Sequence, residues 1–385
     1  MNIAILGFGT IGGGVHEIIN VRGDIGTKAK VVKILDLPQN KDKSELIVCD
    51  IKEIVEDETI DLVVETMGGL HPAHEFILLA LQHGKHVVTA NKAVVAAYLD
   101  EFTQAAHEHQ VAFRYEASTG GGIPWLQSIL KAKRIDRIDS FYGIFNGTTN
   151  YILCDMLNKE KEFDESLKDA QALGYAERDP SADIDGYDVT NKVVISCALA
   201  FNTYIDAALI PVYSMKNITF DDIRYLKAKG LALKYVGDAS IKAQTYDASI
   251  MPNIFKMNSV EANIPDNYNI CTLHGETIGE LKFYGQGAGK LPTANAIVQD
   301  ILDIQEGTGD YGIDLTHAYA YDENAMHAYL IRTDNDIEDG MGDKESYQGH
   351  TYLFTKVMAN KEIRDFFATI QAKDEKALLA KIKDY

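Results

Sequence analysis

The first third of the chain alternates short apolar runs with longer segments of helical periodicity. The runs that predict strands cover residues 2–6, 31–36, 62–65, 86–89 and 111–115, and the helical segments cover 10–20, 72–83 and 93–108. This alternation is typical of the α/β class, in which helices cover both faces of a parallel sheet. Ligands of such sheets bind outside the carboxyl ends of the strands, so the turns at 66–69, 89–92 and 116–124 are candidate binding segments.

A glycine-rich turn follows the first predicted strand and precedes the first predicted helix. It consists of Gly7, Phe8, Gly9, Thr10, Ile11 and Gly12. In this context the pattern predicts a dinucleotide-binding fold. Gly7 would allow the tight turn, Gly9 the close approach of a pyrophosphate, and Gly12 the packing of helix on strand, while amides at the helix start would hold phosphate charge. The alternative is a glycine turn in an α/β fold that binds no nucleotide.

Segment 174–192 concentrates acidic side chains just before an apolar run at 189–201. The carboxylates are Glu177, Asp179, Asp183, Asp185 and Asp188. Asp188 precedes Lys192 by four residues, which places both on one helical face within pairing distance. A small substrate with an ammonium and a carboxylate would find partners of both signs here. A solvated helix pair of little energetic weight is the alternative.

Three other turns carry candidate chemistry. Lys92 begins a predicted helix, where the macrodipole disfavours a cation, so we expect a carboxylate or phosphate beside it. Glu116 and the glycines at 120–122 offer oxygens that a hard cation could use, although a flexible strand-to-helix turn is an equal alternative. Asn150 follows a β-like run at 140–145 and either caps the next helix or binds substrate.

Composition narrows the class of protein. The 385 residues, 46% of them hydrophobic, can bury a large core and predict two or three domains. A net charge of −20 argues against nucleic acid or an anionic membrane as partner. The apolar stretch at 193–201 is too short to span a bilayer, and no signal peptide is evident, so we expect a cytoplasmic location.

Cysteines and histidines give no metal motif at this level. The four cysteines are far apart in the chain and are expected to be reduced thiols. His71 and His74 invite a transition-metal interpretation, but no third ligand at suitable spacing accompanies them. We therefore interpret the two histidines as the start of a surface helix.

Taken in order, these motifs resemble homoserine dehydrogenase. The resemblance rests on residues 7–12, 89–92, 116–124, 146–151, 174–192 and 284–294, and spans residues 1 to about 305. It implies a Rossmann-type dinucleotide-binding domain at 1–130 and 285–310, an α+β substrate-binding and dimerisation domain at 131–284, and a short ACT-like or structural appendage at 311–385. The implied activity is the reversible NAD(P)-dependent reduction of L-aspartate 4-semialdehyde to L-homoserine by a homodimer, on the route to threonine, isoleucine and methionine.

The resemblance also implies residue roles. Lys192 would be the general acid–base residue, Asp188 would orient it, and Lys92 would lie between the nicotinamide and the substrate. The implied substrate-binding residues are Glu177, Asp183, Asn150 and Tyr175. The implied cofactor-binding residues are Gly7, Phe8, Gly9, Thr10, Ile11, Gly12, Asp36, Thr66, Lys92 and Gly287. A monovalent cation, typically sodium, is implied at Glu116 with the backbone carbonyls of Thr119, Gly121 and Ile123.

Two segments depart from the family pattern. Asp36, at the end of the second predicted strand, would bind a ribose diol and repel a 2′-phosphate, which favours NAD over NADP, although Lys41 and Lys43 could partly restore phosphate binding. The tail reads as a strand at 326–332, an acidic linker at 333–349 and a mostly helical end at 361–385. We expect it to lack threonine control.

Two other functions share part of this pattern. Another Rossmann-type amino-acid dehydrogenase or reductase would have the glycine turn but should lack the Asp188–Lys192 loop. A non-catalytic dinucleotide sensor would have no need of Lys192.

A carboxylate beside Lys192 favours its charged form, which suits aldehyde reduction. The oxidation needs a neutral amine, so we expect it to be faster at alkaline pH.

Overall fold

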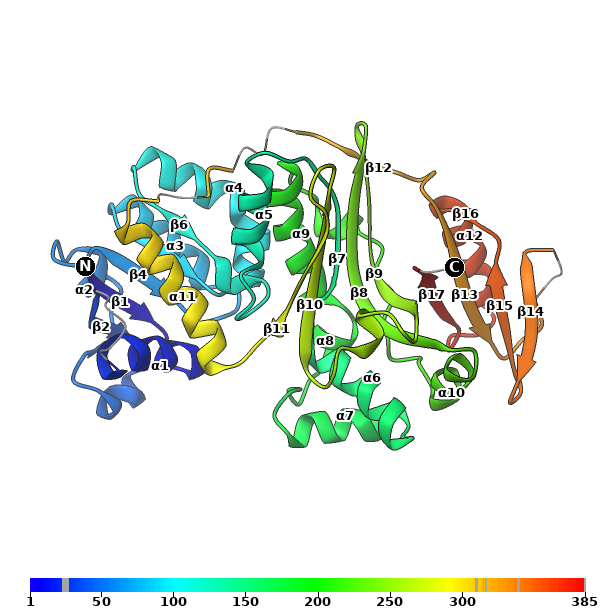
Figure 1. Cartoon of the computed structure of the whole chain (residues 1–385). Helices are drawn as coiled ribbons and strands as arrows, with labels where there is room; N and C mark the ends of the chain where they lie inside the picture. The colour runs from blue at the N-terminus through cyan, green and yellow to red at the C-terminus, as the bar shows by residue number, and fades with distance from the viewer. Residues whose placement is uncertain (23–27, 309–310, 314, 316, 338–339, 384–385) are drawn as a thin grey trace. The chain divides into compact units, whose positions relative to one another are not determined.

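The chain divides into two units (Figure 1). The computed structural model describes residues 1–22, 28–308, 311–313, 315, 317–337 and 340–383. The first unit comprises Met1–Asp136, Val194–Tyr204 and Gly285–His317; the second comprises Arg137–Val193, Ile205–Tyr284 and Ala318–Tyr385. Over the described residues, no helix is both long and apolar enough to cross a membrane.

The first unit is built on a parallel sheet of six strands among the described residues. The strands are β1 (Asn2–Leu6), β2 (Lys30–Leu35), β3 (Ile47–Val48), β4 (Leu62–Glu65), β5 (His86–Thr89) and β6 (Phe113–Arg114). Their order is β3-β2-β1-β4-β5-β6, and every pair is parallel. This is the strand order of dinucleotide-binding sheets, so the predicted α/β class is confirmed.

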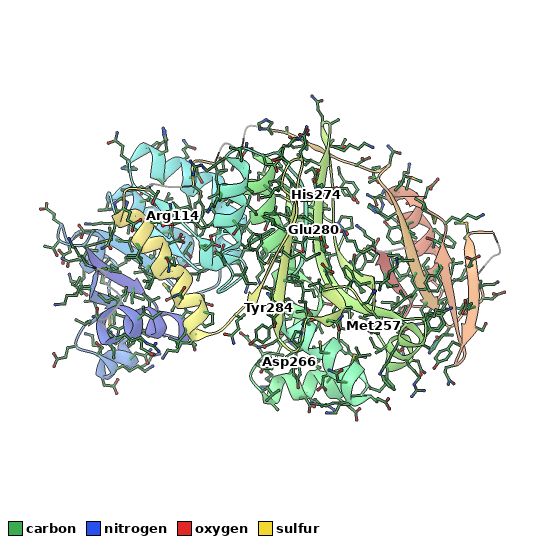
Figure 2. All side chains as sticks on the ribbon, viewed as in Figure 1. Arg114, Met257, Asp266, His274, Glu280 and Tyr284 are labelled. Atoms are coloured by element: carbon green, nitrogen blue, oxygen red, sulfur yellow. The ribbon has the colours of Figure 1, made fainter. Side chains whose placement is uncertain are left out.

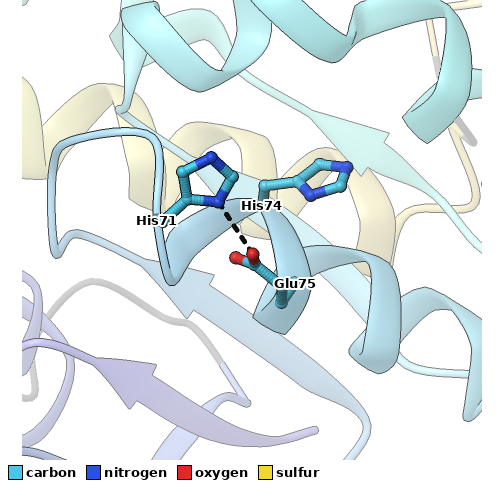
Figure 3. Close-up of side chains that lie close together, drawn as sticks. All are labelled: His71, His74 and Glu75. Atoms are coloured by element: carbon cyan, nitrogen blue, oxygen red, sulfur yellow. Dashed lines mark hydrogen bonds and ion pairs between the residues drawn. The ribbon is translucent and has the colours of Figure 1, made fainter.

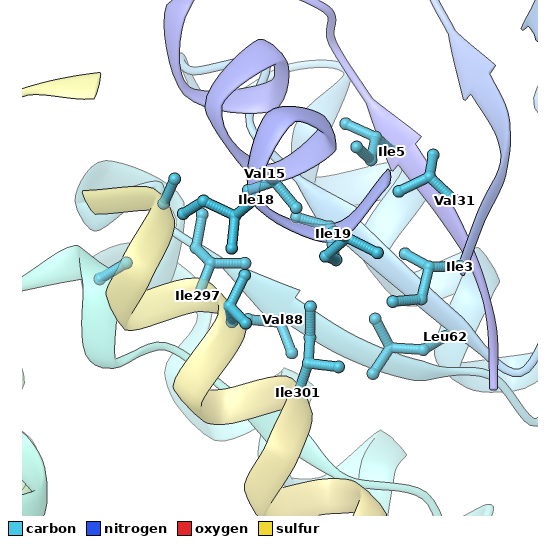
Figure 4. Packing of buried hydrophobic residues seen from close by; sticks show 14 of the residues in the cluster. Ile3, Ile5, Val15, Ile18, Ile19, Val31, Leu62, Val88, Ile297 and Ile301 are labelled. Carbon is cyan, nitrogen blue, oxygen red and sulfur yellow. The ribbon is translucent and has the colours of Figure 1, made fainter. Parts of the chain in front are cut away.

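Helices cover both faces of this sheet. They are α1 (Thr10–His16), η1 (Glu17–Arg22), η2 (Pro38–Lys43), α2 (Lys52–Val55), α3 (Ala73–Gln82), α4 (Lys92–Glu108), η3 (Glu116–Ser118), α5 (Trp125–Lys133) and α11 (Lys290–Gln305). Strand residues such as Ile3 and Ile5 share one core with Val15 of α1 and with Ile297 and Ile301 of α11 (Figure 4). Full burial of one such side chain stabilises the unit by about 1.5–3 kcal/mol.

The second unit is built on a mixed sheet. Its strands are β7 (Ile138–Ile144), β8 (Leu231–Lys242), β9 (Thr245–Lys256), β10 (Tyr268–Gly275), β11 (Gly279–Gln286), β12 (Ala320–Tyr321), β13 (Met326–Thr333), β14 (Gly342–Tyr347), β15 (His350–Thr355), β16 (Met358–Ala359) and β17 (Leu378–Ile382). The main order is β11-β10-β7-β8-β9-β17-β13-β15-β14, while β12 pairs with β9 and β16 with β13. Figure 2 labels His274 of β10 and Glu280 of β11, the two strands at one edge.

Helices of the second unit carry much of the acidic loop that the sequence singled out. They are α6 (Gly147–Lys159), α7 (Phe163–Ala172), α8 (Ser181–Ile184), the first part of α9 (Tyr187–Phe201), η4 (Ala207–Leu209), α10 (Phe220–Ala228), η5 (Glu261–Asn263) and α12 (Asn360–Gln371). From Val194 onward α9 belongs to the first unit. Gly186 precedes α9 with φ +86°, and a Cβ there would lie 2.5 Å from the hydroxyl of Tyr235. The loop therefore needs glycine at the point where it enters α9.

Two predictions for the tail are wrong. Residues 361–385 were expected to be mostly helical, but α12 ends at Gln371 and Leu378–Ile382 forms β17. All five β17 side chains are buried between β9 and β13, so pairing and burial outweigh local helix propensity. The expected linker at 333–349 contains β14, which pairs with β15. The separate C-terminal domain stays a prediction.

Candidate active site

The glycine turn joins β1 to α1 and packs against the loop after β4. Gly7 has φ +92°, and a Cβ on Gly12 would lie only 2.1 Å from the carbonyl oxygen of Gly7. The hydroxyl of Thr66 donates to that same carbonyl at 2.9 Å. A Cβ on Gly9 would meet nothing within 4 Å, so the backbone at the start of α1 is open to a ligand. These positions fit the roles predicted for the three glycines.

Asp36 follows β2 and holds the glycine turn from one side. Its carboxylate accepts hydrogen bonds from the backbone N–H of Phe8 at 2.9 Å and of Leu37 at 2.7 Å, and from the amide of Asn40 at 2.9 Å. Burial raises the pKa of Asp36, but the bonds from Asn40, Leu37 and Phe8 outweigh burial and leave the pKa below its ordinary value. A charged carboxylate is therefore fixed beside the turn.

The ends of β4 and β5 are tied together by a buried carboxyl group. Glu65 ends β4 and accepts from the hydroxyl of Thr89, which ends β5, at 2.5 Å. Burial raises the pKa of Glu65. The Asn91 side chain caps α4, and its amide donates to the carbonyl of Gly69 at 2.7 Å. The structure therefore brings the predicted turns at 66–69 and 89–92 together, with the half-buried Lys92 opening α4.

The side chain of Glu116 accepts hydrogen bonds from the first turn of helix α5. The buried carboxyl group accepts from the backbone N–H of Leu126 at 3.0 Å and of Gln127 at 2.8 Å, at the start of α5. The backbone N–H of Glu116 in turn donates to Asp300 at 2.9 Å. Burial, together with the neighbouring Asp300 carboxyl, raises the pKa of Glu116 to about 8. The oxygens left for a cation at this residue are therefore those of the backbone.

The segment after Glu116 packs against the return segment into the first unit. Gly121 has φ +59°, and a Cβ there would lie 2.4 Å from the carbonyl of Gly287, so two predicted site residues are in direct contact. Thr119 is fully buried. The carbonyl of Ile123 accepts from the N–H of Trp125 at 2.7 Å. The chain thus curls tightly here, and the roles of these carbonyls in holding a cation stay a prediction.

In the second unit, the predicted pair of Asp188 and Lys192 is present. The Lys192 ammonium donates to Asp188 Oδ2 at 2.8 Å and to the carbonyl of Phe145 at 2.6 Å. Lys192 is 7% exposed and Asp188 is 4% exposed. The alternative of a solvated surface pair is therefore wrong. A buried charge pair is a candidate functional feature, although structural pairs such as Lys381–Asp238 are buried to a similar degree.

Asn146 joins this pair to the acidic loop. Its amide donates to Asp183 at 2.7 Å and to Asp188 at 2.8 Å, while its oxygen caps α6 by accepting from the N–H of Thr149 at 2.8 Å. The prediction that Asn150 could cap this helix is wrong, because Asn146 holds the cap position. The available signal was an asparagine directly before the helix-starting residues 147–149, the position that capping asparagines prefer.

Asn150 lies inside α6 and is fully buried. Its amide donates to backbone carbonyls that include those of Asp266 at 2.9 Å and Tyr268 at 3.2 Å; Figure 2 labels Asp266. Its oxygen accepts from the ammonium of Lys234 at 2.8 Å. These contacts give Asn150 a structural role, and its binding of substrate stays a prediction.

Two other predicted substrate residues lie on the exposed part of the loop. The carbonyl of Tyr175 accepts from the hydroxyl of Thr148 at 2.7 Å, and its ring meets that of Tyr151 edge-on at 5.1 Å. The carbonyl of Glu177 accepts from the amide of Gln171 at 3.0 Å. Backbone groups thus hold this loop in place, while Glu177 is exposed to solvent.

The strand order and the glycine turn define a dinucleotide-binding protein. Comparison with known families agrees, since the model described as "homoserine dehydrogenase, NAD binding domain" matches residues 7–116 and the model described as "homoserine dehydrogenase" matches residues 124–302. The chain belongs to the homoserine dehydrogenase family.

Individual relatives extend the likeness over most of the chain. The homoserine dehydrogenase of Synechocystis sp. is 38% identical over 316 residues, which are 79% of this chain and 73% of the relative. That of Neisseria gonorrhoeae is 36% identical over 313 residues, 79% of this chain and 72% of the relative. A crystal structure of the Thiobacillus denitrificans homoserine dehydrogenase superposes with a TM-score of 0.89 at 29% identity, covering 100% of this chain and 98% of the other.

Proposed function

We propose that Lys192 is the general acid and base of the reaction that this chain catalyses. As a member of its family, the chain is an oxidoreductase that reduces L-aspartate 4-semialdehyde to L-homoserine with NAD(P)H. The observation that carries the proposal is the buried pair of Lys192 and Asp188, linked through Asn146 to Asp183.

The chemistry requires a proton at one atom of the substrate. Bound NAD(P)H supplies a hydride to the aldehyde carbon. Lys192 holds its proton on Nζ and donates it to the aldehyde oxygen, and in the oxidation the neutral amine removes it again. Asp188 fixes the orientation of the ammonium through the 2.8 Å bond. Positioned acid–base groups contribute about 10²–10⁴-fold to the rate.

The remaining polar residues bind and orient the substrate in this proposal. Asp183 and Glu177 would bind its amino and hydroxyl groups, and Tyr175 and Asn150 complete the predicted set. Asp183 is supported by its bond to Asn146, which points its carboxylate into the same network as Asp188. Lys92, at the start of α4, would neutralise negative charge of the substrate or the cofactor.

The dinucleotide would be held by the glycine turn of the first unit. Open space over Gly9 and the tight fit of Gly12 support this placement, as does the match of residues 7–116 to an NAD-binding domain. Phe8, Thr10 and Ile11 would contribute backbone, together with Thr66 and Gly287. Asp36 favours NAD, because its charged carboxylate would accept from a ribose diol and repel a 2′-phosphate. Assays with both cofactors test this, and a clear NADPH preference would refute it.

Two further parts of the proposal concern assembly and ions. A monovalent cation, sodium by preference, would be held by carbonyls of Glu116, Thr119, Gly121 and Ile123, a set of oxygens that suits a hard cation. Its role would be to hold the shape of this turn. The active form would be a homodimer assembled through the second unit, located in the cytoplasm.

The test is homoserine oxidation by Lys192→Ala, followed through the absorbance of the reduced cofactor. We expect turnover to be lost while the cofactor still binds, measured by titration. Lys216→Ala is the matched control, because that lysine pairs with Asp185 at 3.2 Å but is exposed. The wild-type oxidation rate should rise between about pH 7 and the lysine range near 10. A flat profile, or full turnover by Lys192→Ala, would count against lysine acid–base chemistry.

A further inference from the structure

We propose that His71, His74 and Glu75 form a binding site for a divalent transition-metal cation of the zinc type. The site lies in the first unit, where the loop after β4 enters α3. It uses no residue of the proposed reaction and does not depend on it.

The three side chains are brought together by one turn of chain (Figure 3). Their ligand atoms all lie within 4.8 Å of one another, and His71 Nδ1 is 2.7 Å from Glu75 Oε1. The statement that the two histidines have no third ligand was wrong. Glu75 stands four residues after His71, so the helix start brings its carboxylate 2.7 Å from the His71 ring and within 4.8 Å of a His74 nitrogen.

The donor set fits zinc and its neighbours in the first transition row. Imidazole nitrogen and carboxylate oxygen are the common protein ligands of Zn²⁺, and three such ligands with a water complete a tetrahedral site. Metal–ligand bonds of about 2.0–2.2 Å place tetrahedral ligand atoms roughly 3.3–3.6 Å apart. The side chains of His71 and Glu75 are more than half exposed, so both can close this small difference by side-chain rotation.

His74 is the best-fixed member of the group. Its ring packs on that of Tyr98 with centroids 4.0 Å apart, and on that of Phe102 at 5.6 Å. Its Nε2 is 2.7 Å from a carboxylate oxygen of Glu101 in α4. A ligating histidine commonly gives its second nitrogen to a carboxylate. Glu101 therefore acts as this outer partner if Nδ1 binds the metal, or as a fourth ligand if Nε2 does.

A plain surface ion pair between His71 and Glu75 is the competing explanation. Such a pair contributes about 0–1 kcal/mol and needs neither the second histidine nor the second carboxylate. Two imidazoles and two carboxylates, His71 from the loop and the other three residues from α3 and α4, supply negative charge and neutral donors together, the combination that attracts a dication. A bound metal would tie His71, at the end of the loop, to α3 and through Glu101 to α4.

The test is zinc titration of the metal-free protein by calorimetry, with cobalt as a spectroscopic probe of tetrahedral coordination. We expect one ion per chain in the wild type. His71→Ala, His74→Ala and Glu75→Gln should each weaken binding by at least tenfold and abolish the tetrahedral cobalt spectrum, and Glu101→Gln should weaken it about 10–100-fold. Circular dichroism checks folding, and the exposed positions of His71 and Glu75 keep the test valid if His74→Ala unfolds.

The matched control is His83→Ala, an exposed histidine at the other end of the same helix that contacts only a backbone carbonyl, at 2.8 Å, among its described partners. It should bind zinc like the wild type. Wild-type protein that binds no zinc would overturn the proposal. So would variants that bind zinc with the stoichiometry and affinity of the wild type.

Discussion

Two lysines of the second unit are buried to a similar degree but have different neighbours. Lys192 is 7% exposed and is paired with Asp188. Lys234 is 3% exposed, and its partners in the described chain are Asn150 Oδ1 at 2.8 Å, the Ile264 carbonyl at 2.9 Å and Cys154 Sγ at 3.4 Å. Burial lowers the pKa of Lys234. Without a carboxylate, a buried ammonium is penalised for its charge.

The difference separates the lysine proposed to be catalytic from one whose contacts are structural. Lys234 joins β8 to α6 and to the segment after η5, and its neighbours are side-chain and backbone groups of the protein's own framework. Lys192 is joined through Asp188 and Asn146 to a loop that carries further carboxylates. Burial alone therefore does not identify a catalytic lysine, and neither does a carboxylate partner, because Lys381 is 2% exposed and pairs with Asp238 at 3.0 Å. What sets Lys192 apart is the link from its partner through Asn146 to a loop with further carboxylates.

The same substitution at both sites gives the largest expected effect. Lys192→Met should lower kcat for homoserine oxidation by about 10²–10⁴-fold, because no group remains to carry the proton. Lys234→Met should leave kcat within a few-fold of the wild type. Steady-state assays at saturating homoserine and cofactor measure both. An equal loss of kcat in the two variants would contradict the proposed difference between the two lysines.

Stability gives a second comparison of the two lysines. Lys234→Met leaves the oxygens of Asn150 and Ile264 buried without their donor, which costs about 1–3 kcal/mol in the free energy of unfolding. Since the folded pKa of Lys234 lies below 10.5, the folded protein binds fewer protons than the unfolded chain just below pH 10.5. Wild-type stability should therefore gain from this group as pH rises toward 10.5.

Urea unfolding of both proteins across the alkaline range measures this gain. Lys234→Met should lack it, whereas Lys192→Met gives a reference for the loss of a paired lysine. A rise of the same size in wild type and Lys234→Met would show that other groups cause it.

Substitution of Asn146 tests the comparison of the two lysines through Asp188, the partner of Lys192. Asn146→Ala removes a helix cap worth about 0.5–2 kcal/mol and the amide bonds to Asp183 and Asp188. Bonds to charged groups contribute about 1.5–3 kcal/mol, so kcat/KM should fall roughly tenfold or more. Thr219→Ala is the control, because it removes only the cap of α10. Equal kcat/KM values in the two variants would show that Asn146 acts only as a helix cap.

Glu116 offers a carboxyl counterpart of Lys234 with a smaller expected effect. Its pKa is raised from 4.5 to about 8, and that of Asp300 is raised to about 6. The folded protein thus holds more protons than the unfolded chain between 4.5 and about 8, and stability should fall as pH rises through that window. Glu116→Gln should show a smaller fall in the urea midpoint. An identical fall in both proteins would assign the proton elsewhere.

The sequence predicted those parts of the site that depend on contacts between residues close together in the chain. The tight fit of Gly12 against Gly7 and the pairing of Asp188 with Lys192 follow from spacings of four or five residues. The bond from Asn146 to Asp188 spans 42 residues, and no local pattern encodes it. The contact between His71 and Glu75 spans only four residues, so it too is encoded locally, by a carboxylate at the start of a helix.

Strand β17 follows all the other strands along the chain, yet lies between β9 and β13, parallel to the first and antiparallel to the second. Until this segment leaves the ribosome, the stretches of β9 and β13 that β17 joins have no partner on that side, and unpaired edges invite association with other chains. The sheet of the second unit can therefore be completed only after nearly the whole described chain has been synthesised. Removing Leu378–Ile382 would leave that seam open permanently, with aggregation as the expected result.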